Sequence, residues 1–361
     1  MDFFRVSFFC SFFRPKTVSY FFCQFICFLD LNKRVYNHVP GECSHIHGIE
    51  TGAGDMEFFD STVFFTSGTD LNNATNSSGA IFAWKLEGRE IVKTELIGFK
   101  EDSQLFNPFG ISTFMNILMV TNPLNGNSSY DRVDIFHILP TKTRATFPKI
   151  KFIKSVSADV MTGIRGIAAI GKEQFYVANT FKFRSKWAKD AEWLLGLNTG
   201  AILYFNGKKI EIAVKDISTP TGLAYDRHKR QLFVGSYSAQ KIYVYRANFG
   251  NLTKVNEINL QVSPYFISLD PITASLLVAV QPLKFRNIIY ETRPWNYFTP
   301  SQILQIKKLK SKWSITQLYA NDGATISAAT TALTIFLPEK PPQLLIGNLR
   351  TGILSCDLTS V

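Results

Sequence analysis

Short apolar runs with near-regular alternation fill the chain after residue 50, and Gly, Pro, Asn and Asp interrupt them. This period-two pattern is typical of β-strands that bury one face. The stretch GIAAIGKEQFYVAN, which starts at Gly166, shows the recurring unit: a strand, a tight polar turn and a second, strongly apolar strand. Comparable strand pairs begin at Asp55, Gly110, Gly222, Phe266 and Ile326.

Further strands follow most of these pairs, in residues 79–86, 132–139, 200–207, 241–248 and 301–308. The units repeat about every 50 residues, which is typical of propellers with one four-stranded sheet per unit. The 361 residues therefore predict an all-β fold, a six-bladed β-propeller. A pair of irregular β-sandwiches is the alternative. In a propeller, the residue before each inner strand faces the mouth of the central channel, so we expect any site there.

The first part of the chain has a different composition. Residues 18–29 form an apolar run that follows Arg5, Arg14 and Lys16. The run has the length of a signal-peptide core and is shorter than the about 20 residues of a spanning helix. We expect an uncleaved signal or signal-anchor within residues 1–40 and the propeller in residues 41–361. An N-terminus without a targeting role is the alternative.

The cysteines and glycosylation motifs point to a lumenal or extracellular body. Of the five cysteines, only Cys43 and Cys356 lie beyond the apolar leader, one near each end of the predicted propeller. A disulfide between them would close the ring and would require an oxidising compartment. N-x-Ser/Thr motifs for glycosylation occur at Asn73, Asn76, Asn127 and Asn251. We therefore expect the secretory pathway, with the protein membrane-anchored or extracellular.

The net charge of +11 changes this picture little. The Lys and Arg residues are scattered, and no nucleic-acid motif is present, so we expect no nucleic-acid partner. A solvated basic surface accounts for the charge, and attraction to an anionic membrane surface is the second interpretation.

One amphipathic helix is predicted, over residues 180–197. Phe183, Trp187 and Leu194 fall on one apolar face, and basic residues border it. A basic amphipathic helix that carries Trp can lie on a membrane surface. The same face could instead pack on the top of the propeller, and the pattern alone does not choose between the two.

Four stretches carry a family resemblance: GIETGAGDMEFF (48–59), FNPFGISTF (106–114), SLDP (268–271) and GNLRTGILSCDL (347–358). They resemble the paraoxonases, a family of calcium-dependent lactonases and arylesterases. The resemblance runs from about Cys43 to Leu358. It implies a six-bladed propeller, an uncleaved N-terminal signal, a helix over the channel mouth that contacts lipid, and a disulfide between Cys43 and Cys356.

The resemblance also implies a catalytic and a structural calcium in the channel, but most of the ligand positions are changed. Gly54 occupies the catalytic Glu position, Phe109 the position of the proposed histidine base, and Pro123 approximately that of its partner histidine. Other ligand positions hold Arg165, Gly166, Thr221, Tyr265 and Phe266. Only Asp55, a structural-calcium ligand, is retained, with the Ile111 carbonyl as a second ligand. Because calcium takes six to eight oxygen ligands, we expect one structural calcium at most and no catalytic calcium.

These replacements predict a non-catalytic protein that acts by binding. Ester hydrolysis would lack both the metal Lewis acid and the base that activates water. Some membrane-anchored relatives of the paraoxonases assist the folding or assembly of membrane proteins such as ion channels. The resemblance therefore implies a membrane surface and a membrane-protein client as partners. The alternatives are an arylesterase or lactonase with a rearranged calcium site, and a binder of apolar ligands.

Overall fold

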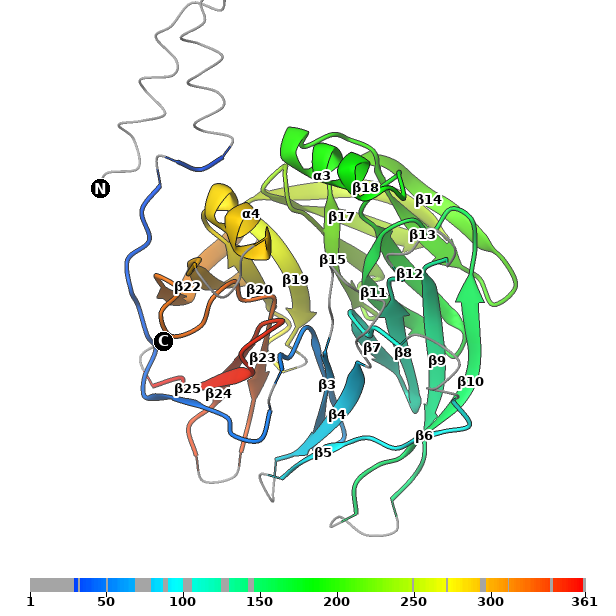
Figure 1. The fold of residues 1–361 in the computed structure, drawn as a ribbon, viewed down its shortest axis with the longest axis horizontal. Coiled ribbons are helices and arrows are strands. Elements are labelled where there is room, and N and C mark those ends of the chain that lie inside the picture. The colour runs from blue at the N-terminus through cyan, green and yellow to red at the C-terminus, as the bar shows by residue number, and fades with distance from the viewer. Residues whose placement is uncertain are drawn as a thin grey trace, which may run out of the picture.

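Six β-sheets stand around a common axis, with β2, β7, β11, β15, β19 and β23 as the innermost strands, and form a six-bladed β-propeller (Figure 1). This computed structural model describes residues 29–359 except 32, 50, 69–78, 87–89, 100–105, 125–129, 142–145, 249, 271, 293–296, 311 and 338–339. The apolar leader up to residue 28 lies outside the described residues. The predicted fold class is confirmed, and the sandwich alternative is wrong.

The blades are antiparallel sheets, and among the described strands only β6 runs parallel to its neighbour, β10. Blade 1 contains β2 (Met56–Phe59), β3 (Thr62–Ser67), β4 (Ala80–Lys85) and β5 (Ile91–Lys93). Blade 2 contains β6 (Leu96–Ile97), β7 (Ile111–Phe114), β8 (Ile117–Asn122), β9 (Arg132–Ile138) and β10 (Ile150–Ser157). Blade 3 contains β11 (Ile164–Gly171), β12 (Gln174–Asn179), β13 (Gly200–Phe205) and β14 (Ile210–Ile217).

The second half of the ring repeats this arrangement. Blade 4 contains β15 (Pro220–Asp226), β16 (Gln231–Ser236), β17 (Lys241–Asn248) and β18 (Asn251–Asn259). Blade 5 contains β19 (Ser263–Leu269), β20 (Leu276–Gln281), β21 (Ser301–Leu309) and β22 (Lys312–Asn321). Blade 6 contains β23 (Thr331–Ile335), β24 (Gln343–Gly347), β25 (Ile353–Asp357) and, as its outermost strand, β1 (Cys43–His45).

The hydrophobic core is divided among the interfaces between neighbouring blades. On β9, Val133 and Ile135 pack against blade 3, whereas Phe136 and Ile138 pack against blade 1. Alternate residues of a strand point to opposite faces of the sheet, so one strand supplies two interfaces. Such clusters join every adjacent pair of blades, including blades 6 and 1. The period-two pattern of the sequence is therefore the direct cause of the ring.

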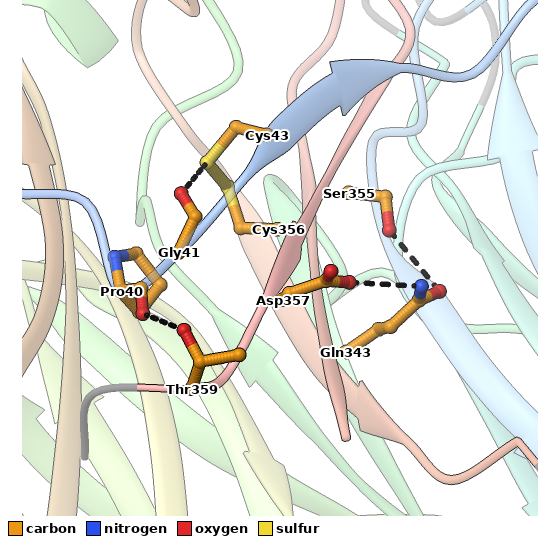
Figure 2. The surroundings of a disulfide bond; sticks show 8 residues. All are labelled: Pro40, Gly41, Cys43, Gln343, Ser355, Cys356, Asp357 and Thr359. Atoms are coloured by element: carbon orange, nitrogen blue, oxygen red, sulfur yellow. Dashed lines mark hydrogen bonds between the residues drawn. A yellow bond between two sulfur atoms is a disulfide. The ribbon is translucent and has the colours of Figure 1, made fainter. Parts of the chain in front are cut away.

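The ring is closed by strand pairing and by a disulfide between the two ends of the propeller (Figure 2). Cys43 on β1 and Cys356 on β25 are register partners and are bonded to each other. The backbones approach closely beside the bridge, because a Cβ placed on Gly41 would lie 2.4 Å from the Asp357 carbonyl oxygen. The predicted disulfide is confirmed.

Two helices lie at the end of the propeller where the inner strands begin, which we call the mouth end (Figure 1). The helix α3 (Lys186–Leu195) joins β12 to β13, and α4 (Lys284–Thr292) joins β20 to β21. In each blade the second strand runs back towards the start of the first strand, so both connections reach the same end. Among the described residues, no helix is long and apolar enough to cross a membrane.

The predicted helix and the last predicted inner strand differ from the structure, and one helix of the structure was not predicted. The helix is shorter than residues 180–197, because the backbone N–H of Lys182 is tied to the Glu192 carboxylate and the Phe181 carbonyl to Thr162. A second helix, α4, was not predicted. The last inner strand begins at Thr331 rather than Ile326, because hydrogen bonds from Ala329 to the Ser301 hydroxyl and from Ser301 to the Ile326 carbonyl hold this stretch against blade 5.

Candidate functional site at the mouth of the propeller

Aromatic side chains fill the mouth end and form one buried group, the mouth cluster, made of Phe109, Tyr237, Tyr265 and Phe266 with Trp193 and Leu349 packed against it. The Phe109 ring is fully buried, and its centroid lies 5.3 Å from that of Phe266 and 6.4 Å from that of Tyr265. Phe109 precedes its inner strand, β7, as predicted, whereas Tyr265 and Phe266 lie within the inner strand β19 rather than before it. Sequence reasoning missed Tyr237 and Trp193, because they come from a β-turn and from α3.

Arg165 places a fixed positive charge in this aromatic surrounding. Its guanidinium carbon lies 5.6 Å from the ring centroid of Phe109, 5.5 Å from that of Tyr265 and 5.6 Å from that of Phe181. The guanidinium also donates a hydrogen bond of 2.5 Å to the Tyr265 hydroxyl. Cation–π contacts of this kind stabilise a partly desolvated guanidinium. The side chain is thus held in the mouth by several independent contacts.

An acidic side chain on α4 accompanies this arginine. Burial raises the pKa of Glu291, and the positive charges of Arg165 and Arg350 partly oppose that rise. On the same helix, Asn287 donates a hydrogen bond of 3.3 Å to the Tyr237 hydroxyl, whose own pKa burial raises well above its ordinary value. The mouth therefore combines a guanidinium, a carboxyl group and neutral phenols.

The structure brings Asp55 and Ile111 together, but in a geometry that does not suit calcium. The Asp55 carboxylate accepts a hydrogen bond of 3.1 Å from the backbone N–H of Ile111, so the amide rather than the carbonyl of Ile111 faces it. Its other oxygen accepts from the Met56 N–H and the Thr331 hydroxyl, each at 3.0 Å. Burial raises the pKa of Asp55 to about 8. Hydrogen-bond donors thus surround the carboxyl group where a cation would need oxygens.

Threonine hydroxyls donate hydrogen bonds to the backbone carbonyl oxygens that could otherwise serve as metal ligands. At successive blades, a threonine donates to the backbone carbonyl at the start of the next blade. The pairs are Thr66 to Phe109, Thr121 to Arg165, Thr180 to Pro220, Thr221 to Pro264 and Thr330 to Gly54, at 2.6–3.0 Å. Thr66, Thr121 and Thr180 each stand within one residue of the end of a second strand, a sequence signal that could have revealed these contacts.

The remaining positions of the expected metal and base sites carry no suitable ligand or base. Gly166 makes room for the neighbouring blade, because a Cβ there would lie 2.3 Å from the Thr221 carbonyl oxygen. Pro123 offers only its carbonyl, which accepts from the Asn107 amide at 3.0 Å. Within the described ranges, no group of three or more His, Cys, Asp or Glu side chains could hold a metal ion. The residues present therefore do not fit the calcium sites that the family resemblance implies.

The apolar face of α3 points away from the propeller. Phe183, Trp187 and Leu194 are exposed, Trp187 by 76%, whereas the buried helix residues are Ala188 and Glu192. Glu192 holds the incoming chain, since its carboxylate accepts from the Lys182 N–H at 3.0 Å. This orientation disfavours the alternative in which the apolar face packs on the propeller.

The glycosylation motifs fall in two groups. Asn251 is exposed and opens β18, the outermost strand of blade 4. Asn73, Asn76 and Asn127 lie outside the described residues. The position of Asn251 on an outer edge leaves room for a glycan, and its use remains a prediction.

The comparisons with known proteins agree with this architecture. The arylesterase family model matches residues 15–358, so the chain belongs to the arylesterase family. Mechanosensory abnormality protein 6 of Caenorhabditis elegans is 30% identical over 95% of this chain and 93% of that protein. Serum paraoxonase/arylesterase 1 of Mus musculus is 28% identical over 88% of both chains. A luciferin-regenerating enzyme shares the fold, with a TM-score of 0.54, 11% identity, and coverage of 88% and 95%.

Proposed function

We propose that this chain is a non-catalytic member of the arylesterase family that acts by binding at a membrane surface. One observation carries the proposal: the guanidinium of Arg165, packed among the rings of the mouth cluster, stands where the family resemblance places a calcium ligand. A fixed positive charge repels a divalent cation at short range. The Arg165 guanidinium therefore disfavours binding of the calcium ion that the family chemistry needs.

The chemistry of ester hydrolysis has further requirements that the mouth does not meet. An ester carbonyl needs a Lewis acid or hydrogen-bond donors to stabilise the oxyanion, and water needs a base. Phe109 and Pro123, which replace the expected histidines, cannot take up a proton. Arg165 already donates to Tyr265, and Asp55 already accepts from three donors.

The first test measures hydrolysis of phenyl acetate and a simple lactone by the purified full-length chain, with calcium or with EDTA. Mouse serum paraoxonase/arylesterase 1 serves as the positive control under the same conditions. We expect no turnover above that of heat-unfolded protein, although circular dichroism shows the sample to be folded. Turnover that EDTA abolishes would overturn the proposal and establish the alternative, an arylesterase or lactonase with a rearranged calcium site.

Exposed apolar and basic side chains of α3 support the membrane part of the proposal. Trp187 and Leu195 are the most exposed apolar residues of α3, and Lys186 on the helix and Lys182 and Arg184 just before it are exposed as well. An amphipathic helix of this composition favours an anionic membrane interface. The worm relative is named for a mechanosensory defect rather than for an ester substrate. We propose a membrane protein of the secretory pathway as the client.

The membrane contact predicts quenching of Trp187 by brominated lipids. We reconstitute the full chain in vesicles containing brominated phosphatidylserine and measure tryptophan fluorescence. Trp187→Phe should remove most of the quenchable signal, because the exposed ring inserts at the interface. Trp313→Phe, a change on the outer strand β22, should leave the quenching unchanged. Equal quenching in the wild type and Trp187→Phe would exclude this helix as the contact.

A further inference from the structure

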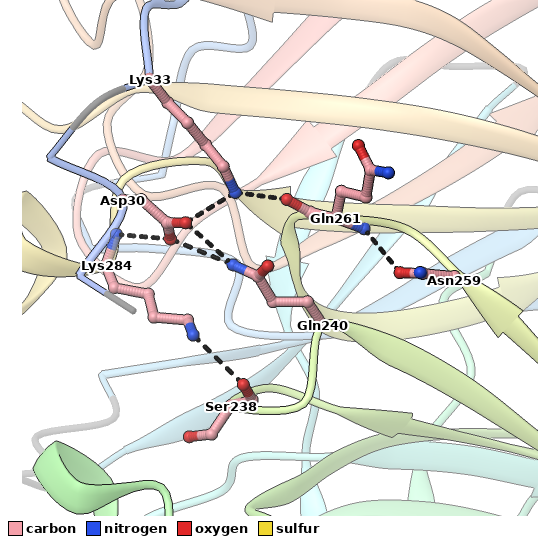
Figure 3. A network of polar contacts seen from close by, with 7 residues as sticks. All are labelled: Asp30, Lys33, Ser238, Gln240, Asn259, Gln261 and Lys284. Atoms are coloured by element: carbon pink, nitrogen blue, oxygen red, sulfur yellow. Dashed lines mark hydrogen bonds and ion pairs between the residues drawn. The ribbon is translucent and has the colours of Figure 1, made fainter. Parts of the chain in front are cut away.

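The first described residues of the chain, which directly follow the leader, are bound to the mouth end of the propeller through Asp30 (Figure 3). The Asp30 side chain is fully buried and accepts from the Gln240 amide at 3.0 and 3.1 Å. Lys33 pairs with it at 2.6 Å and also donates to the Gln261 carbonyl oxygen. A buried carboxylate requires such partners, since desolvation without them costs several kcal/mol.

Asp30 and the residue before it, Leu29, cap α4. The first turn of a helix leaves backbone N–H groups without intrahelical acceptors. Here the Lys284 N–H points to the Asp30 carboxylate at 3.4 Å, and the Phe285 N–H donates to the Leu29 carbonyl at 3.2 Å. A negative charge at this end also interacts favourably with the helix dipole. The N-terminal segment thus supplies a cap for a helix 254 residues further along the chain.

Gln240 and α4, which both contact Asp30, also connect to residues of the mouth cluster. Gln240 belongs to the turn between β16 and β17, and the same turn carries Tyr237. The helix α4 also contacts that turn directly. Lys284 Nζ donates to the Ser238 carbonyl oxygen at 3.1 Å, and the Asn287 amide donates to the Tyr237 hydroxyl. Tyr237 in turn packs against Trp193, with ring centroids 5.8 Å apart.

We infer that Leu29, Asp30 and Lys33 form a strap that couples the N-terminal leader to the mouth: Asp30 clamps α4 against the β16–β17 turn and thereby holds the mouth cluster in its packed arrangement. The leader precedes the strap directly, so a pull on the leader, or a cut that removes residues 29–33, would act on the mouth. This inference concerns control of the mouth and does not depend on whether the mouth is catalytic.

The test compares hydrogen exchange in the full-length wild type, Asp30→Asn and Gln240→Met. Asp30→Asn keeps the shape but removes the charge, and we expect the amides of 237–240 and 285–292 to exchange about tenfold faster. Acrylamide quenching of Trp193, obtained by difference from Trp193→Phe, should rise as well. The matched control is Asp60→Asn, an exposed carboxylate in the β2–β3 turn, which should change neither signal.

Faster exchange confined to residues 29–33, with α4 and the turn at wild-type rates, would overturn the coupling. If Asp30→Asn fails to fold, Gln240→Met decides the question, because it cuts only the link from the strap to the turn. That variant should speed exchange at 237–240 while α4 keeps its cap. Wild-type exchange at 237–240 in this variant would refute the clamp.

Discussion

Replacing both Cys43 and Cys356 by serine is expected to lower the free energy of unfolding by on the order of 5 kcal/mol. The bridge spans 313 residues and therefore restricts nearly the whole unfolded chain. In the folded protein it joins β1 to β25, where it adds to the strand pairing and to backbone hydrogen bonds such as that from the Ile46 N–H to the Ile353 carbonyl oxygen. Losing it removes the covalent closure and leaves the β1–β25 pairing and the apolar contacts between blades 6 and 1 to hold the ring.

The measurement is urea unfolding of the wild type and the double variant, each with and without reductant. The reduced wild type should unfold at the urea concentration of the double variant, which makes it the matched control. The unfolding transition should also broaden if the ring opens before the other blades unfold. Coincident curves for the oxidised wild type and the double variant would show that the noncovalent contacts alone close the ring.

Arg165→Met is expected to destabilise the protein by about 3 kcal/mol, because a charged hydrogen-bond donor and its cation–π contacts are lost together. The change deletes the hydrogen bond to Tyr265 and the contacts with three rings. It also removes a positive charge that lowers the pKa of Glu291 against the effect of burial. Arg165→Lys should restore only part of the loss, because an ammonium cannot reproduce the planar contacts of a guanidinium.

A double-mutant cycle with Glu291→Gln separates charge from packing. If the two charges interact, the double variant should be more stable than the sum of the single losses predicts. Arg184→Met is the matched control, since Arg184 is exposed and stacks on a single ring, Tyr130, at 4.1 Å. It should cost about 1 kcal/mol or less. If the stability losses of the Arg165 and Glu291 variants are additive, the two charges do not interact and their attraction does not stabilise the mouth.

The alternating pattern of apolar residues was enough to predict most of the architecture. Alternation is a local property, and each blade buries both faces, so the apolar positions reveal the strands wherever the turns are short. The repeat of these pairs predicted the ring, and the positions of Cys43 and Cys356 predicted its closure. Phe109 at the mouth followed from its place directly before an inner strand. These features depend on neighbours that lie close in the sequence or on a repeat that the sequence displays.

Other features depended on contacts between distant segments, which no local pattern encodes. The apolar face of α3 points outward because Glu192 is buried and holds the chain before the helix. The helix α4 is short and takes its cap from Asp30 at the other end of the chain. Asp55 and Ile111 are adjacent as expected, yet the backbone direction aims an N–H at the carboxylate. The sequence by itself therefore determined the propeller and its changed mouth residues, whereas tertiary packing decided the orientation of the helix, the cap and the hydrogen-bond donors.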